Sequence, residues 1–312
     1  MAIGNVAGRI GTGGGARPRS SWERRRSLTG FMFIVPALVI VAIFFLIPLG
    51  FAFWMSLTKW NIAGFQEFVG LDNYQAIPGD RKFLSAAVFT TFYTVIVTAI
   101  TFFLGFALAL LVRRELRRFV TLRTMFYLPV VIGTAVGSFI FLWLFNDQVG
   151  AVNGVLRALG LIEENIVWLA HPDTALITLV AMITWKSAGF AMITLLIAMH
   201  AVPSELYEAA RVDGATGRQQ LRHITVPLIR PTIALVIILL VTTSYLAFDQ
   251  FYIITRGGPN NSTITLVYWI YNQAFIGFKL GYATAMSVVL MVFLVILSAI
   301  QLRLLRNDPT EV

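Results

Sequence analysis

The sequence predicts an all-α membrane protein with six transmembrane helices. Of its 312 residues, 58% are hydrophobic and only 12% are charged, whereas soluble globular proteins carry about 25% charged residues. The apolar residues gather in six runs, each long enough to cross roughly 30 Å of hydrocarbon as a helix. These runs extend over about Phe31 to Ser56, Ala86 to Val112, Thr124 to Phe145, Thr174 to Met199, Leu228 to Ile254 and Tyr282 to Leu302.

The chain carries few residues of the kinds that perform catalysis or bind metals. It has no cysteine, and its three histidines, at positions 171, 200 and 223, lie far apart without metal-ligand spacing. We therefore expect no catalytic residue, no metal site and no cofactor bound by this chain. An intramembrane enzyme would need a catalytic constellation that this sequence does not offer.

The first 30 residues combine glycine-rich sequence with arginines. Gly11 to Gly15 do not form a nucleotide-binding loop, because no Lys-Ser or Lys-Thr pair follows them. The apolar run that begins at Phe31 is too long for the core of a cleaved signal peptide. We expect a flexible basic tail over residues 1–30, a six-helix membrane domain over 31–302 and a second tail over 303–312.

The basic residues are distributed unequally between the two sides of the predicted membrane domain. Segments on the side of the N-terminus hold seventeen arginines and lysines, and segments on the opposite side hold six. Cytoplasmic loops carry the excess of positive charge in membrane proteins. The sequence therefore predicts a multi-pass membrane protein with both termini in the cytoplasm, and the net charge of +9 indicates orientation rather than binding to nucleic acid.

The predicted cytoplasmic loop 203–231 is the longest polar segment with helical signals between two spans. Ser204 is expected to cap a helix that Asp213 and Gly214 end, and a second short helix is expected from Gln219 to Ile224. Apolar residues recur at helical spacing beside arginines, which suits docking into the groove of a partner. A solvated loop between two membrane helices explains the same spacing.

Lys186 and Asp249 are ionisable residues that lie away from the cytoplasmic ends of predicted spans. Lys186 is near the middle of the fourth span, and Asp249 is near the outer end of the fifth, beside Tyr245 and Gln250. Such residues face protein or a water-filled cavity, because a charge in lipid is costly. Lys186 could contact a solute, a buried acid or backbone carbonyls. Aromatic rings beside hydrogen-bonding groups suit a sugar near Asp249, and they also suit an interfacial belt.

The segment between the fifth and sixth spans contains a helix-breaking turn and a short apolar run. Gly257, Gly258 and Pro259 interrupt the helix. The following run from Thr263 to Phe275, which includes Tyr271 and Asn272, is short for a crossing. We expect a re-entrant or interfacial segment here.

Several of these stretches resemble the permease subunits of binding-protein-dependent ABC importers. The loop 203–231 contains EAA, then DG, then Ile and Pro at the spacing of the EAA signature of that family. FVGLDNY after the first span, TRGGP after the fifth and GYATAMSVVL in the sixth resemble its carbohydrate-uptake, maltose-type branch. The resemblance covers most of residues 30 to 305. It implies the type I ABC importer permease fold with cytoplasmic coupling helices, located in the bacterial or archaeal plasma membrane.

The resemblance also implies where the functional residues lie. The positions that match the ATPase-coupling loop are Glu208, Ala209, Ala210, Asp213, Gly214, Ile224 and Pro227. The residues that we assign to the substrate pathway are Trp185, Lys186, Tyr245, Asp249, Gln250, Tyr271 and Asn272.

The same resemblance implies the partners of the chain. These are a second permease subunit, expected to be a different chain, two cytoplasmic ATPase subunits that use ATP and Mg, and an external solute-binding protein. This chain would form half of the pathway for a sugar or sugar-like solute: a disaccharide, amino sugar, oligosaccharide, polyol or glycerol phosphate. The alternative is an ion-coupled secondary transporter of a small polar solute, with Lys186 and Asp249 as its ion-coupling pair.

Overall fold

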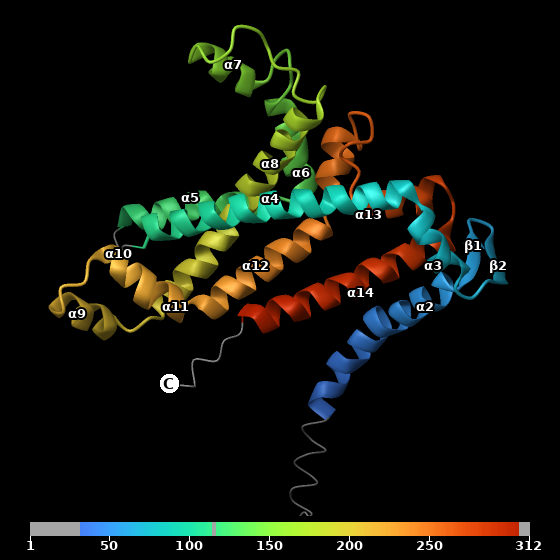
Figure 1. Ribbon diagram of the computed structural model, residues 1–312, viewed down its shortest axis with the longest axis horizontal. Helices are drawn as coiled ribbons and strands as arrows, with labels where there is room; N and C mark the ends of the chain where they lie inside the picture. The colour runs from blue at the N-terminus through green and yellow to red at the C-terminus, as the bar shows by residue number, and fades with distance from the viewer. Residues whose placement is uncertain (1–31, 114–116, 306–312) are drawn as a thin grey trace, which may run out of the picture. The chain divides into compact units, whose positions relative to one another are not determined.

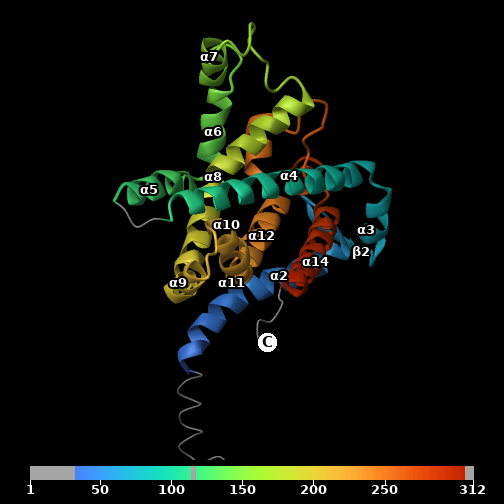
Figure 2. The same ribbon diagram turned by 60° about the vertical axis from the view of Figure 1, so that its left-hand side comes forward.

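The computed structural model describes residues 32–113 and 117–305, and most of them are helical (Figures 1 and 2). The chain divides into two units, residues 1–52 and 53–312. The expected N-terminal tail, 1–30, lies outside the described residues, as does most of the expected C-terminal tail. The last helix continues to Leu305, three residues past the predicted end of the membrane domain.

The first predicted span is a helix from Met32 to Ser56, and its most apolar window has no buried residue in this chain. Its middle widens into a π-helical turn, η1 (Ala42–Leu46), and α2 (Ile47–Ser56) follows. Pro48 lies two residues after this turn. Because proline has no N–H to donate to the preceding turn, a local change of helical pitch is expected there.

The outer segment after the first span folds as a small hairpin and a short helix. Strands β1 (Thr58–Asn61) and β2 (Gly64–Phe68) pair antiparallel, and α3 (Asp72–Ala76) and η2 (Ile77–Gly79) follow. The Asn73 amide donates to the carbonyls of Ser56, at 2.8 Å, and Thr58, at 3.0 Å. The FVGLDNY stretch therefore fixes the hairpin to the end of α2.

Three further predicted spans are continuous helices. These are α4 (Arg81–Leu111), α8 (Pro172–His200) and α14 (Leu280–Leu305). Helix α4 packs against α8 and α12 (Arg230–Tyr245), and α12 packs in turn against α14 (Figures 1 and 2). Half of the apolar window of α8 is buried inside the chain, a larger share than in the other three continuous helices, so α8 is central to the bundle.

The third and fifth predicted spans are not straight helices. Helix α5 (Arg117–Val131) meets α6 (Thr134–Leu144) at 100°, and the segment Gly217–Leu228 meets α12 at 70°. Pro129 lies inside α5 and Gly133 precedes α6, whereas Pro231 lies in the first turn of α12. Helix α12 also ends at Tyr245, nine residues before the predicted end of its span, and the π-helical turn η4 (Phe251–Thr255) follows a break.

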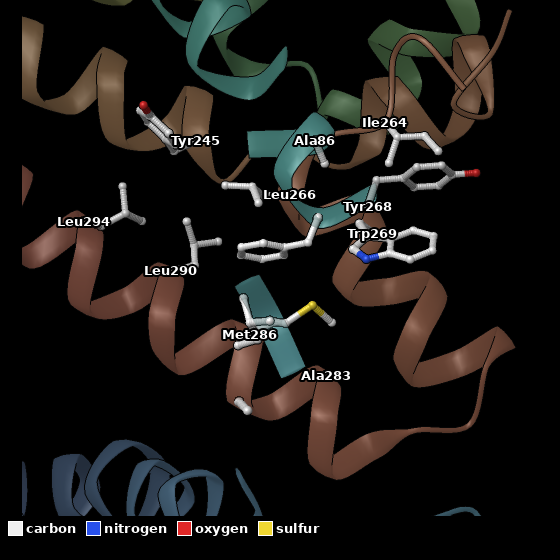
Figure 3. Close-up of a cluster of buried hydrophobic side chains, with 13 residues drawn as sticks. Ala86, Tyr245, Ile264, Leu266, Tyr268, Trp269, Ala283, Met286, Leu290 and Leu294 are labelled. Carbon is white, nitrogen blue, oxygen red and sulfur yellow. The ribbon is translucent and has the colours of Figure 1, made fainter. Parts of the chain in front are cut away.

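Several helices of the unit formed by residues 53–312 share a buried apolar cluster. Figure 3 shows side chains of α13 (Leu266–Tyr271) and α14 that meet Ala86 of α4. Helix α13 continues into η5 (Asn272–Ile276), and Thr265 caps its start by accepting from the N–H of Tyr268. The predicted short segment between the last two spans is therefore a helical turn that packs on the bundle. A separate short helix, α7 (Ala151–Ala158), follows α6 and precedes α8 along the chain.

Asp80 joins three of these elements through one carboxylate. It accepts hydrogen bonds from the indole N–H of Trp269 at 2.9 Å and the hydroxyl of Tyr282 at 3.1 Å. It also caps α4 by accepting from the N–H groups of Lys82 and Phe83. Burial raises the pKa of Asp80, but these hydrogen bonds outweigh that effect and hold the pKa below its ordinary value of 3.8.

Replacing Asp80 by alanine is expected to lower the thermal unfolding midpoint at neutral pH, because the tie between α4, α13 and α14 is lost. Since the folded-state pKa is lowered, the stabilisation by Asp80 is fully present above pH 3.8 and is lost as the pH falls through the lower, folded-state pKa. The difference between variant and wild type should therefore shrink in acid. Unfolding midpoints measured against pH test this, with exposed Asp173, in the first turn of α8, as the matched Asp→Ala control.

Candidate functional site

The predicted cytoplasmic loop is a helix, a glycine turn and a second helix, as expected. Helix α9 (Ser204–Val212) ends at the turn formed by Asp213 and Gly214, and α10 (Gly217–Gln220) follows. Gly214 has a φ of +79°, a left-handed conformation that favours glycine. The expected cap by Ser204 is wrong: α9 begins at Ser204 without a side-chain cap. The capped helix is α10, where Thr216 and Gln219 form a capping box.

Most side chains of α9 are exposed, including apolar ones. Leu206 is 43% exposed and Val212 is 88% exposed. Glu208 lies beside them in an exposed ion pair with Arg211, at 3.9 Å. A helix with this mixture of apolar and charged exposed side chains suits docking into a groove of a partner.

The predicted coupling residues fall into two groups. Glu208, Ala209, Asp213 and Gly214 are exposed on α9 and its turn, and Ala210 is half-buried. Ile224 lies in the π-helical turn η3 (Leu221–Thr225), and Pro227 lies in the single turn α11 (Val226–Leu228). The second group therefore connects α10 to the start of α12.

A cavity of about 430 Å³ lies between α4, α5, α6, α8 and α12, within residues 53–312. It brings together three predicted pathway residues, Lys186, Asp249 and Gln250. Hydroxyl groups that were not predicted from the sequence line the same space: Thr98, Thr101, Thr134, Ser187, Thr243 and Ser244. In the sequence, these residues appear only as serines and threonines inside apolar runs. That pattern does not distinguish a hydroxyl that faces a cavity from one that bonds to a carbonyl of its own helix.

The other four predicted pathway residues lie outside the lining of this cavity. The ring of Trp185 packs against Phe141, with centroids 5.4 Å apart. The Tyr245 hydroxyl lies 3.0 Å from the hydroxyl oxygen of Thr91. Tyr271 belongs to a ring cluster with Phe248, Tyr252, Tyr268 and Phe275. In the described ranges, the buried side-chain oxygen of its neighbour Asn272 has no hydrogen-bond partner. Phe248 both joins that cluster and lines the cavity.

Lys186 bonds to backbone at the bend between α5 and α6. Its Nζ donates to the carbonyl of Ile132 at 2.8 Å and to that of Val130 at 3.3 Å. The bend leaves these carbonyls without helical partners, and inside a membrane such groups need another donor. Of the three partners of Lys186 that the sequence left open, a solute, a buried acid or backbone carbonyls, the structure shows the backbone carbonyls. Among the described residues, no ion pair joins Lys186 to Asp249.

The cavity offers hydrogen-bond donors and acceptors rather than a reactive constellation. The hydroxyl oxygen of Thr98 is buried and has no hydrogen-bond partner among the described residues, so it is available to a solute or water in the cavity. Gln250 is 2% exposed, and its amide donates to the hydroxyl of Tyr93 at 3.3 Å. In the part of the chain that the structure describes, no three histidine or acidic side chains gather as metal ligands do.

Comparison with known proteins places the chain in a family. Residues 102–307 match the model of the binding-protein-dependent transport system inner membrane component. The probable ABC transporter permease protein YurN of Bacillus subtilis is 32% identical over 284 residues, which cover 90% of this chain and 97% of that protein. The sn-glycerol-3-phosphate transport system permease protein UgpA of Agrobacterium fabrum is 33% identical over 88% of this chain and 93% of its own length.

A solved structure has the same fold. In the crystal structure of a bacterial ABC transporter involved in the import of the acidic polysaccharide alginate, one chain superimposes with a TM-score of 0.81 at 22% identity. The match covers 93% of this chain and 99% of that chain. The chain therefore has the type I ABC importer permease fold. It has four helices long and apolar enough to cross a membrane, and six crossings if each of the two bent pairs is one span.

The family model covers well over half of the chain, and the relatives match over almost their whole length. This evidence favours an importer over the ion-coupled secondary transporter, and it assigns a transport role rather than an enzymatic one. The chain belongs to the binding-protein-dependent transport system inner membrane components and is a multi-pass permease subunit of an ABC importer.

Proposed function

We propose that this chain forms half of the pathway for a sugar or sugar-like solute that an external binding protein delivers. The observation that carries the proposal is the polar cavity between the spans. Its hydroxyl groups, the Gln250 amide and the Asp249 carboxylate can exchange hydrogen bonds with a hydroxyl-rich solute. Phe248 adds an apolar ring surface at the same cavity, of the kind on which the ring face of a sugar packs.

The names of several relatives agree with this solute class. Besides the sn-glycerol-3-phosphate permease, they include the multiple sugar-binding transport system permease protein MsmF of Streptococcus mutans, which is 31% identical over 88% of this chain and 94% of that protein. They also include the sulfoquinovosyl glycerol transport system permease protein SmoG of Agrobacterium fabrum, 31% identical over 90% of this chain and 91% of its own length. A small polyol or sugar derivative fits both these names and the lining of the cavity.

The exposed helix α9 and its turn are the proposed contact with a cytoplasmic ATPase. Glu208 to Gly214 would occupy a groove of the ATPase, with ATP and Mg bound by that partner and not by this chain. Closure of two ATPase subunits would then move α9, and Ile224 and Pro227 would carry the movement into α12. Such coupling requires that the two states of the transporter differ in their contacts with α9.

The excess of basic residues supports an orientation for this arrangement. With both termini in the cytoplasm, the loop 203–231 is cytoplasmic as well, whereas the hairpin β1–β2 and α7 face the binding protein. The second half of the pathway is assigned to a different permease chain. The domain limits proposed from sequence, with a membrane domain over 31–302 between two tails, fit this orientation.

The proposal is tested by purifying the chain with its co-expressed permease and ATPase partners and measuring ATP hydrolysis in lipid vesicles. We expect the external binding protein, loaded from a panel of maltose, trehalose and sn-glycerol 3-phosphate, to stimulate hydrolysis and drive uptake. Thr98→Val should reduce the apparent affinity for uptake about tenfold, since one hydrogen bond in a closed site is lost. Its matched control is Thr124→Val, because Thr124 is exposed on α5.

Two results would contradict the proposal. The first is uptake that follows an ion gradient without stimulated ATP hydrolysis. The second is equal behaviour of the Thr98 and Thr124 variants, which would place the solute outside this cavity.

A further inference from the structure

Within the described part of the chain, the side chain of Tyr207 in helix α9 makes a hydrogen bond and a cation–π contact with other elements. Of the nine residues in α9, only Tyr207 and Ala210 are partly buried, and the other seven are exposed. These two residues are three positions apart, so they lie on the same face of the helix. Their face is therefore the inner one, opposite the exposed side chains that are available to a partner.

The hydroxyl of Tyr207 bonds to the segment that leads into α12. It lies 2.9 Å from the hydroxyl oxygen of Thr225, which is fully buried at the end of η3. Thr225 also lies 3.5 Å from the carbonyl of Gln220, at the limit of a hydrogen bond. The Tyr207 hydroxyl is thus the close partner of a buried polar group, and its removal leaves Thr225 poorly satisfied.

The ring of Tyr207 contacts the cytoplasmic end of another span. The guanidinium carbon of Arg113 lies 4.7 Å from the ring centroid, within cation–π range. Arg113 follows the last turn of α4, and its carbonyl lies 3.0 Å from Nε2 of His200, the last residue of α8. One ring therefore touches the end of α4 directly and the end of α8 through a single intermediate residue.

We propose that Tyr207 is the positioning residue that transmits movement of α9 to the spanning helices. This inference rests on the proposed function, in which an ATPase moves α9. A force on the exposed face of a short helix reaches the bundle only through contacts on its inner face and through the flanking chain. In the described residues, the hydrogen bond and the cation–π contact that link α9 side chains to α4 and η3 both belong to Tyr207.

The absence of cysteine from the chain makes the movement measurable without knowledge of the solute. Ser187, which lines the cavity, is replaced by cysteine in the full complex with its permease and ATPase partners in lipid vesicles. A membrane-impermeant maleimide then labels this residue with and without Mg-ATP and vanadate, which hold the ATPase closed. We expect the labelling rate to change when the nucleotide is trapped.

In this background, Tyr207→Ala is expected to reduce the nucleotide-dependent change in labelling about tenfold, because both the hydrogen bond and the cation–π contact are lost. Tyr207→Phe keeps the ring over Arg113 and should give a smaller loss. Thr225→Val removes the same hydrogen bond from the other side and should match Tyr207→Phe. The control is Tyr127→Ala, an exposed tyrosine of α5 that is 38% accessible.

The outcomes distinguish a failure of the proposed coupling to an ATPase from a failure of the role assigned to Tyr207. A reference protein with no nucleotide-dependent labelling would overturn the proposed coupling to an ATPase. Normal coupling in the reference together with an unaltered change in Tyr207→Ala would overturn the role of Tyr207 alone. Because Thr225 is buried and cannot touch the ATPase, a loss in Thr225→Val with ATPase subunits still bound supports transmission within this chain. Loss of bound ATPase in Tyr207→Phe would instead place Tyr207 in the docking surface and refute its inward role.

Discussion

Replacing Gly214 by valine is expected to leave insertion into the membrane intact and to abolish ATP-driven uptake. Gly214 has a φ of +79°, and no atom lies within 4 Å of the position that a Cβ would take. The effect therefore comes from the backbone: left-handed conformations cost about 1–2 kcal/mol for residues with a Cβ, and β-branched residues are the most penalised. The turn after α9 would open, so the helix would no longer hold its orientation.

The measurement is solute uptake and stimulated ATP hydrolysis by the purified complex, with membrane content checked separately. Gly217→Val is the matched control, since Gly217 also has open space around its Cβ position but is not among the glycines with positive φ. Gly214→Asn should retain much of the activity, because asparagine tolerates the left-handed region. Equal uptake by Gly214→Val and the wild type would refute the role assigned to this turn.

Replacing Gly189 by alanine is expected to lower the thermal stability of the protein. A Cβ at Gly189 would overlap the carbonyl oxygen of Phe126, so α8 and α5 could not keep their present approach. Overpacking of this kind costs about 1–3 kcal/mol. The two helices would separate near Lys186, whose bonds to the carbonyls of Val130 and Ile132 depend on the same approach.

Thermal unfolding in detergent measures this effect. Gly154→Ala is the control, because Gly154 is inside helix α7 with nothing within 4 Å of its Cβ position. Alanine at such a helical site is expected to be neutral or to stabilise by up to about 1 kcal/mol. Similar midpoints for the two variants would show that α5 can shift at little cost, contrary to the packing described above.

The positions of the long helices follow from the hydropathy of the sequence. The helix and turn of the loop 203–231 follow largely from its glycine and charged residues. Continuous apolar runs of sufficient length have few alternatives to a helix in a membrane, so α4, α8 and α14 follow from sequence alone. The turn at Gly214 also follows from sequence, since aspartate and glycine after a helical pattern end a helix.

Local sequence left the two bends undecided. Pro129 and Gly133 are tolerated in spanning helices when neighbouring groups satisfy the freed carbonyls. Whether they produce a bend depends on what lies beside them. Here the donor is Lys186, more than fifty residues further along the chain. That pairing exists only once α8 packs against α5.

Tertiary structure also decided which residues line the cavity, because the lining depends on how distant helices pack. Its hydroxyl groups come from helices that are distant in sequence, and the pattern within each run is that of ordinary threonines and serines in a membrane helix. Four aromatic or polar residues that looked equally suitable, Trp185, Tyr245, Tyr271 and Asn272, pack elsewhere. The contact of Tyr207 with Arg113 and Thr225 joins three segments in the same way. The hydrophobicity of a run is the sum of contributions from its own residues, so it can be read from local sequence. A cavity or a contact between helices depends on how the helices cross, and the packing of many side chains together determines that crossing.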